Sequence, residues 1–77
     1  MIYSNGLEMF REVAKYQSFT KAADVLDVSS AAVSRQVKSL EQRLGLLLLH
    51  RTTRSVALTE AGRNLFDALN RSEVEVS

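Results

Sequence analysis

The stretch "SSAAVSRQVKSLEQRLG", residues 29–45, decides how this chain folds. Either of its two leading hydroxyl residues, Ser29 or Ser30, is suited to cap the N-terminus of a helix. Gly45 is the residue best able to take the left-handed conformation that ends a helix. Between these ends the spacing of apolar residues predicts an amphipathic helix whose inner side comprises Val33, Val37, Leu40 and Leu44.

The opposite side of this helix has small, cationic and amide side chains and no acid: Ala31, Arg35, Lys38 and Gln42. A helix face of this kind is often only solvated. Here, however, residues 29–63 carry six cationic and two acidic side chains, a net charge of +4, whereas the whole chain has +1. The positive charge is therefore concentrated where a phosphate-rich partner would be met.

Two more helices are predicted before this one. Residues 5–16, "NGLEMFREVAKY", have helical apolar periodicity, and residues 19–26, "FTKAADVL", follow possible caps at Ser18 and Thr20. "DVSS" then breaks the second helix. A short helix, a tight turn and a longer helix with a basic outer face are typical of a helix-turn-helix.

After Gly45 the apolar period changes. Residues 46–58, "LLLLHRTTRSVAL", predict a β-hairpin with a polar, basic turn. Thr59 then offers a cap for a fourth helix, which continues to Val76. Its apolar side is predicted to comprise Ala61, Leu65, Ala68, Leu69 and Val76. The fold class is therefore mainly α, a winged helix-turn-helix with a three-helix core, a β-hairpin wing and a further helix.

This arrangement predicts binding of double-stranded DNA, with helix 30–44 in the major groove and wing 50–56 at the minor groove. Ser34 and Arg35 lie near the end of the helix that reaches base edges first, and arginine can bond both guanine acceptors. Phosphate contacts are predicted one helical turn later and at the start of the second helix, from Lys38, Thr20 and Lys21. Arg54, at the hairpin tip, is predicted to contact the minor groove or a phosphate, while Arg51 either contacts DNA or pairs with Glu41 or Glu60.

Four motifs occur in order: "SFTKAA" (18–23), "AVSRQVKSLEQRLG" (32–45), "RTTR" (51–54) and "LTEAG" (58–62). Together they resemble the DNA-binding domain of LysR-type transcriptional regulators over roughly residues 7–66. The resemblance implies base contacts from Ser30, Ala31, Ala32, Ser34 and Arg35, phosphate contacts from Thr20, Lys21, Lys38 and Arg51, and a minor-groove contact from Arg54.

This chain departs from the family at two places. Members often have Gln-Pro where it has Ser30-Ala31, so this chain lacks a long side-chain amide that could read adenine. They also often have Phe where it has Leu49, which is a core exchange.

The resemblance also implies two regions and a larger protein. Residues 1–58 are expected to be the winged helix-turn-helix, and residues 59–77 the start of a linker helix that forms a homodimer through Leu65, Leu69 and Val76. A small-molecule inducer would act only through a C-terminal domain that these 77 residues do not include. The chain is then expected to be either the isolated DNA-binding domain of a cytoplasmic bacterial regulator, which is the favoured interpretation, or a naturally short protein.

Other functions find less support. The same fold could be a protein-interaction or dimerisation module, but the outer face of helix 30–44 has no aromatic or aliphatic anchor. No serine has a histidine and an acid in a nucleophile motif, so no enzyme is predicted. His50 has no companion ligands and there is no cysteine, so neither a metal nor another cofactor is expected. No membrane-spanning or signal segment is predicted.

Overall fold

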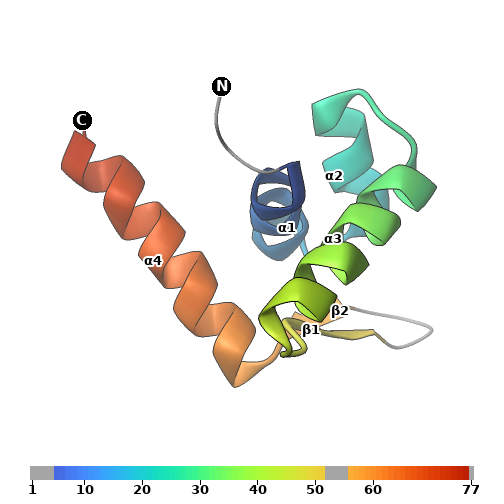
Figure 1. The fold of residues 1–77 in the computed structure, drawn as a ribbon. Coiled ribbons are helices and arrows are strands. Elements are labelled where there is room, and N and C mark those ends of the chain that lie inside the picture. The colour runs from blue at the N-terminus through green and yellow to red at the C-terminus, as the bar shows by residue number, and fades with distance from the viewer. Residues whose placement is uncertain (1–4, 52–55, 77) are drawn as a thin grey trace.

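The computed structural model describes residues 5–51 and 56–76, with side chains described for residues 6–51 and 56–71. Three helices precede a two-stranded antiparallel hairpin and a fourth helix follows it, which confirms the predicted winged helix-turn-helix (Figure 1). The elements are α1 (Asn5–Tyr16), α2 (Phe19–Leu26), α3 (Ser30–Leu44), β1 (Leu49–Arg51), β2 (Val56–Leu58) and α4 (Glu60–Val76).

Local caps fix the ends of α2 and α3. The hydroxyl oxygens of Ser18 and Ser29 accept hydrogen bonds from the N–H groups of Lys21 and Ala32, at 3.1 and 3.0 Å. Asp27 ends α2 in the left-handed conformation, with φ of 60°. Because Ser29 takes the cap of α3, Ser30 becomes the first helical residue and its side chain is exposed.

Gly45 ends α3 as predicted. Its φ of 71° lies in the left-handed region, and its N–H donates to the carbonyl oxygen of Glu41 at 2.9 Å. A side chain at this position would strain the backbone.

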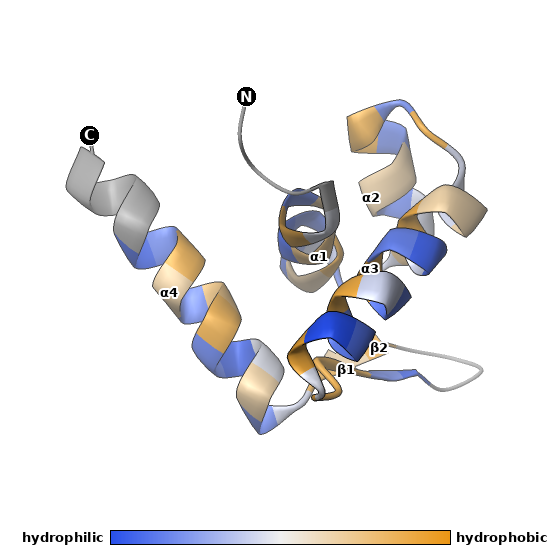
Figure 2. Ribbon diagram, in the orientation of Figure 1, coloured by the Kyte–Doolittle hydropathy of each residue, from blue (hydrophilic) through white to orange (hydrophobic). Residues whose placement is uncertain are grey.

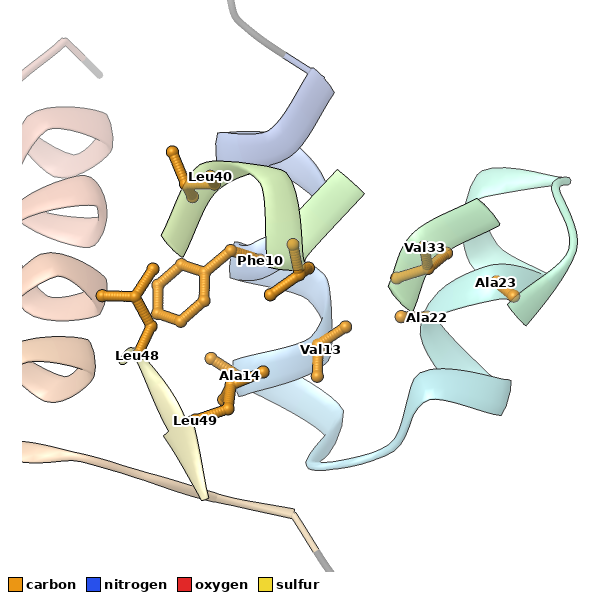
Figure 3. Packing of buried hydrophobic residues seen from close by; sticks show 10 residues of the cluster. Phe10, Val13, Ala14, Ala22, Ala23, Val33, Leu40, Leu48 and Leu49 are labelled. Carbon is orange, nitrogen blue, oxygen red and sulfur yellow. The ribbon is translucent and has the colours of Figure 1, made fainter. Parts of the chain in front are cut away.

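The hydrophobic core forms where α1, α2, α3 and β1 meet. Phe10 and Val13 on α1, Val33 and Val37 on α3, and Leu48 just before β1 have no exposed surface. Figure 3 shows the Phe10 ring pointing toward Leu48, with Val33 lying beside Ala22 and Ala23 of α2. The two alanines on α2 let α3 approach closely, as their small size predicts.

One part of the predicted apolar stripe is wrong. Leu44 is 47% exposed, and its neighbours Leu46 and Leu47 are 49% and 65% exposed, whereas Leu48 and Leu49 are buried. A methyl group placed on Gly6 would lie 3.2 Å from the Leu40 Cβ. The N-terminal end of α1 therefore lies against Leu40, whereas the Leu44 side chain, one turn later on α3, is left exposed.

The fourth helix is attached to the core through its first turns. The Thr59 hydroxyl donates to the carbonyl oxygen of Leu47 at 2.7 Å and accepts from the N–H of Gly62 at 3.0 Å. A side chain on Gly62 would collide with the carbonyl oxygen of Leu48, so α4 can pass this close only with glycine there. The residues of α4 that pack on the core are Ala61, Leu65, Phe66 and Leu69, of which Phe66 was not predicted.

Candidate nucleic-acid interface

The N-terminal half of α3 presents the predicted base-contacting residues outward. Figure 2 shows hydrophilic residues alternating with hydrophobic ones along this helix. Ser30, Ala31 and Arg35 are exposed, and Ala32 and Ser34 are partly exposed, while Val33 between them is buried. The helix therefore holds a polar and cationic edge outward from a fixed apolar side, which is the geometry that groove reading requires.

The predicted phosphate contacts lie on two helices. Lys38 is exposed one turn beyond Ser34 and Arg35 on α3. Thr20 and Lys21 are exposed in the first turn of α2, where the Ser18 hydroxyl already accepts the Lys21 N–H. A hydroxyl and two cations therefore face solvent on the helix-turn-helix.

The only acid in α3, Glu41, is not on this surface. Glu41 is 6% exposed, and one of its carboxylate oxygens accepts the backbone N–H groups of Leu48 and Leu49 at 2.8 and 3.2 Å. Two peptide N–H donors satisfy the buried charge and attach β1 to the end of α3. The exposed face of α3 consequently has no negative charge.

Arg51 completes this arrangement. Its Nη2 lies 3.3 Å from the second carboxylate oxygen of Glu41, and its guanidinium lies over the Phe19 ring, 5.1 Å from the centroid. Of the two predicted partners, the structure therefore pairs Arg51 with Glu41. The Arg51 side chain is 28% exposed, so these contacts do not enclose it completely.

The hairpin places β1 and β2 beside the helix-turn-helix. Leu49 pairs with Leu58, His50 with Ala57 and Arg51 with Val56. The predicted minor-groove residue, Arg54, lies outside the described residues, so the predicted wing of 50–56 is described only at its two ends.

Residues predicted to form a dimer are divided between two situations. Leu65 and Leu69 are partly buried and pack against the core of their own chain. Val76 belongs to α4, but its side chain is not among those described. In Figure 1, α4 leaves the hairpin and runs outward, so its C-terminal end lies at the edge of the molecule.

Glu41 and Phe19 join the wing to the helices. Sequence reasoning named Glu41 only as one of two possible partners of Arg51, and it gave Phe19 no role. A signal for Glu41 was present: it follows Val37 by four positions, which places it at the border of the apolar stripe. An acid at that border of a cationic helix has to be paired with internal donors. For Phe19, the pattern of α2 held no comparable signal.

Within residues 5–51 and 56–76, no group of three or more histidine, cysteine, aspartate or glutamate side chains could hold a metal ion. Across the same ranges, none of the helices has the length and apolar character needed to cross a membrane.

Comparison with known proteins identifies the family. The model described as "Bacterial regulatory helix-turn-helix protein, lysR family" matches residues 4–63. YcaN of Escherichia coli (strain K12), an uncharacterized HTH-type transcriptional regulator, is 52% identical over 67 residues, covering 87% of this chain and 22% of that protein. The HTH-type transcriptional activator AmpR of Yersinia enterocolitica is 50% identical over 68 residues, covering 88% and 23%. This chain thus spans less than a quarter of the length of these curated relatives.

Solved structures agree. The DNA-binding domain of BenM in complex with catB site 1 DNA superimposes with a TM-score of 0.87 at 36% identity, over 97% of this chain and 83% of that chain. The CbnR DNA-binding domain in complex with DNA gives 0.85 at 32% identity, over 97% and 86%. With a family model matching most of its length and a fold shared with these domains, the chain belongs to the LysR family of bacterial regulatory helix-turn-helix proteins.

Proposed function

We propose that this chain binds double-stranded DNA in a sequence-specific manner as the DNA-binding domain of a transcriptional regulator. The observation that carries the proposal is the exposed, acid-free N-terminal half of α3, held by a buried apolar side. Two similar domains, those of BenM and CbnR, were solved in complexes with DNA. In this proposal, α3 (residues 30–44) enters the major groove and the wing (residues 50–56) meets the minor groove.

Within that interface we assign two kinds of contact. Base edges are met by Ser30, Ala31, Ala32, Ser34 and Arg35, because they lie at the end of α3 that enters the groove first. Phosphates are met by the exposed cations and hydroxyl of both helices and by the solvent-facing part of Arg51, and the minor groove by Arg54. Phosphate contacts supply most of the affinity and its salt dependence, and base contacts supply discrimination.

Fluorescence anisotropy tests the proposal directly. The chain is titrated against a random-pool duplex and a selected duplex from about 50 to 200 mM salt, where counterion release changes affinity steeply. Tight, salt-dependent binding with preference for the selected duplex is expected. Equal binding to both pools would contradict sequence specificity, and no binding by the folded chain would favour the protein-interaction function.

That second function has one observation in its favour. Leu44, Leu46 and Leu47 are exposed together at the C-terminal end of α3, away from the residues assigned to bases. The two functions therefore require different residues. A Leu47→Ser variant should leave DNA affinity unchanged, whereas it would weaken a protein contact made through this end.

We further propose that the chain forms a homodimer through the outer part of α4 and acts in the bacterial cytoplasm by binding rather than catalysis. Leu65 and Leu69 can contribute only the surface that the core leaves exposed, and Val76 lies farther out on the helix. Sedimentation velocity over a concentration series checks the assembly. A single species at the monomer mass of 8.6 kDa throughout would contradict it.

A further inference from the structure

We propose that Glu41 is a positioning residue for DNA binding: its buried carboxylate holds the Arg51 guanidinium beside the N-terminal end of α2, ready to meet phosphate. The inference rests on the proposed function and adds to it a residue that does not itself face DNA. In this proposal the Glu41–Arg51 ion pair connects the DNA-binding surface to the buried contact of Glu41 with Leu48 and Leu49.

The two oxygens of the Glu41 carboxylate have different partners: backbone N–H groups for one, and Arg51 for the other. One oxygen accepts two backbone N–H groups, from Leu48 and Leu49, at 2.8 and 3.2 Å, and the other lies 3.3 Å from Arg51 Nη2. Because two peptide N–H groups hold the first oxygen, the whole carboxylate is fixed in place, and its second oxygen does not follow the arginine side chain if that side chain moves. The ion pair therefore brings Arg51 to a fixed point, whereas a surface pair would leave both partners free.

A second contact fixes the direction of the guanidinium. Its carbon lies 5.1 Å from the centroid of the Phe19 ring, which supports it from another helix. A guanidinium carries five N–H donors, and the contact with Glu41 occupies a single nitrogen. The side chain is 28% exposed, so an anion from solvent can approach it.

Phe19 lies next to the residues of α2 that are assigned to phosphate. Phe19 opens α2 and is followed directly by Thr20 and Lys21, both exposed and both assigned to phosphate. Arg51, which arrives from β1, is thus held at the same helix end. A long side chain that is already ordered loses less conformational entropy on binding than a free one, which favours affinity.

Charge and position predict opposite results for one variant. Glu41→Gln removes a negative charge next to a DNA-binding surface, so charge alone predicts tighter binding. Loss of the anchor predicts weaker binding, by about two- to tenfold, the loss expected when one long side chain must be ordered on binding. Glu60→Gln, at an exposed acid on α4, makes the same charge change and should bind as the unmutated chain does, or slightly more tightly.

A double-variant cycle measured by anisotropy on the selected duplex separates positioning from general destabilisation. Each variant is assayed at a temperature where circular dichroism shows it fully folded. If Glu41 acts through Arg51, Glu41→Gln weakens binding in the unmutated chain and has no further effect in Arg51→Ala. An equal loss in both backgrounds, or tighter binding by Glu41→Gln, would overturn the proposal.

NMR relaxation of arginine side chains tests the same claim without DNA and without relying on how well a variant folds. In the free chain, the Arg51 Nε should be more ordered than that of exposed Arg35, and in Glu41→Gln the difference should disappear. Equal mobility of the two in the unmutated chain would overturn the positioning role. If the unmutated chain binds no duplex while Arg51 is ordered, the proposed function fails and the ion pair is a structural device only.

Discussion

The two ends of α3 differ in almost every physical respect. At the N-terminal end, Ser30, Ala31 and Arg35 are exposed, and no ion pair within the described residues involves Arg35. At the other end, the Glu41 carboxylate is buried and bonded on both oxygens, by two peptide N–H groups and by Arg51. One helix thus leaves its donors available to a partner at its N-terminal end, residues 30–35, which we call the open end. At its C-terminal end, where Glu41 bonds the hairpin, it uses its polar groups internally; we call this the saturated end.

This difference between the two ends explains how a small domain can present a rigid DNA-reading surface. A small domain buries little apolar area, so every fixed contact counts. The saturated end joins α3 to the hairpin, and the hairpin in turn joins α4 through Thr59 and Gly62. At the other end Val33 packs on α2, but the outward side chains described there make no such attachments. Variants at the two ends should therefore change different quantities.

The largest effect is expected from Leu48→Ala. Leu48 is fully buried at the saturated end, and truncating it removes apolar burial and leaves a cavity beside Phe10. The free energy of unfolding should fall by about 2–5 kcal/mol, measured by urea denaturation. The variant that remains folded should keep the base preference of the unmutated chain. A changed preference at unchanged stability would break the comparison.

Arg35→Ala should do the reverse. Removing an exposed side chain at the open end should leave the unfolding free energy unchanged and weaken binding to the selected duplex by about 1–3 kcal/mol. The preference at one base pair should flatten. Titration with duplexes altered one pair at a time measures this. A uniform loss on all duplexes would show that Arg35 meets phosphate and not a base.

Ser29→Ala tests the boundary of the open end. Its hydroxyl caps α3 through the Ala32 N–H at 3.0 Å, and loss of such a cap costs about 1 kcal/mol. Fraying would disturb Ser30 and Ala31, so binding should weaken together with stability. Ser29→Asp, which retains an acceptor, is the matched control for the cap. If Ser29→Ala is as stable as the unmutated chain, the cap is not what orders this end.

Lys38→Ala should have the smallest effect. Lys38 is exposed one turn beyond the assigned base contacts, and its loss should weaken binding to every sequence alike. The slope of log affinity against log salt concentration should fall by about one. Anisotropy over the same salt range gives the slope. A shift in preferred sequence would move Lys38 into the base-reading group.

Much of the fold follows from local signals in the sequence. Ser18 and Ser29 mark helix starts through hydroxyl acceptors, and Gly45 marks a helix end through its left-handed backbone, all effects that act within one turn. The open end of α3 was predictable for the same reason, since helical periodicity alone decides which residues can turn outward.

The saturated end was harder because its contacts join residues far apart in the chain. Periodicity placed Leu44 inward, but burial also requires a neighbour that covers the side chain, and Leu44 remains 47% exposed. The need for glycine at position 62 could not be predicted, because the group that excludes a side chain there, the Leu48 carbonyl, belongs to another part of the chain. For Glu41, Arg51 could be named as a possible partner, but the backbone N–H donors of Leu48 and Leu49 depend on where the hairpin packs.

The different roles of the two ends of α3 can be tested by selection from a randomised duplex library with three folded chains: unmutated, Leu48→Ala and Arg35→Ala. If the open end reads sequence and the saturated end only supports it, the unmutated chain and Leu48→Ala will select the same site, and Arg35→Ala will lose one position of it. Selection of the full site by Arg35→Ala, or of a different site by Leu48→Ala, would contradict this division.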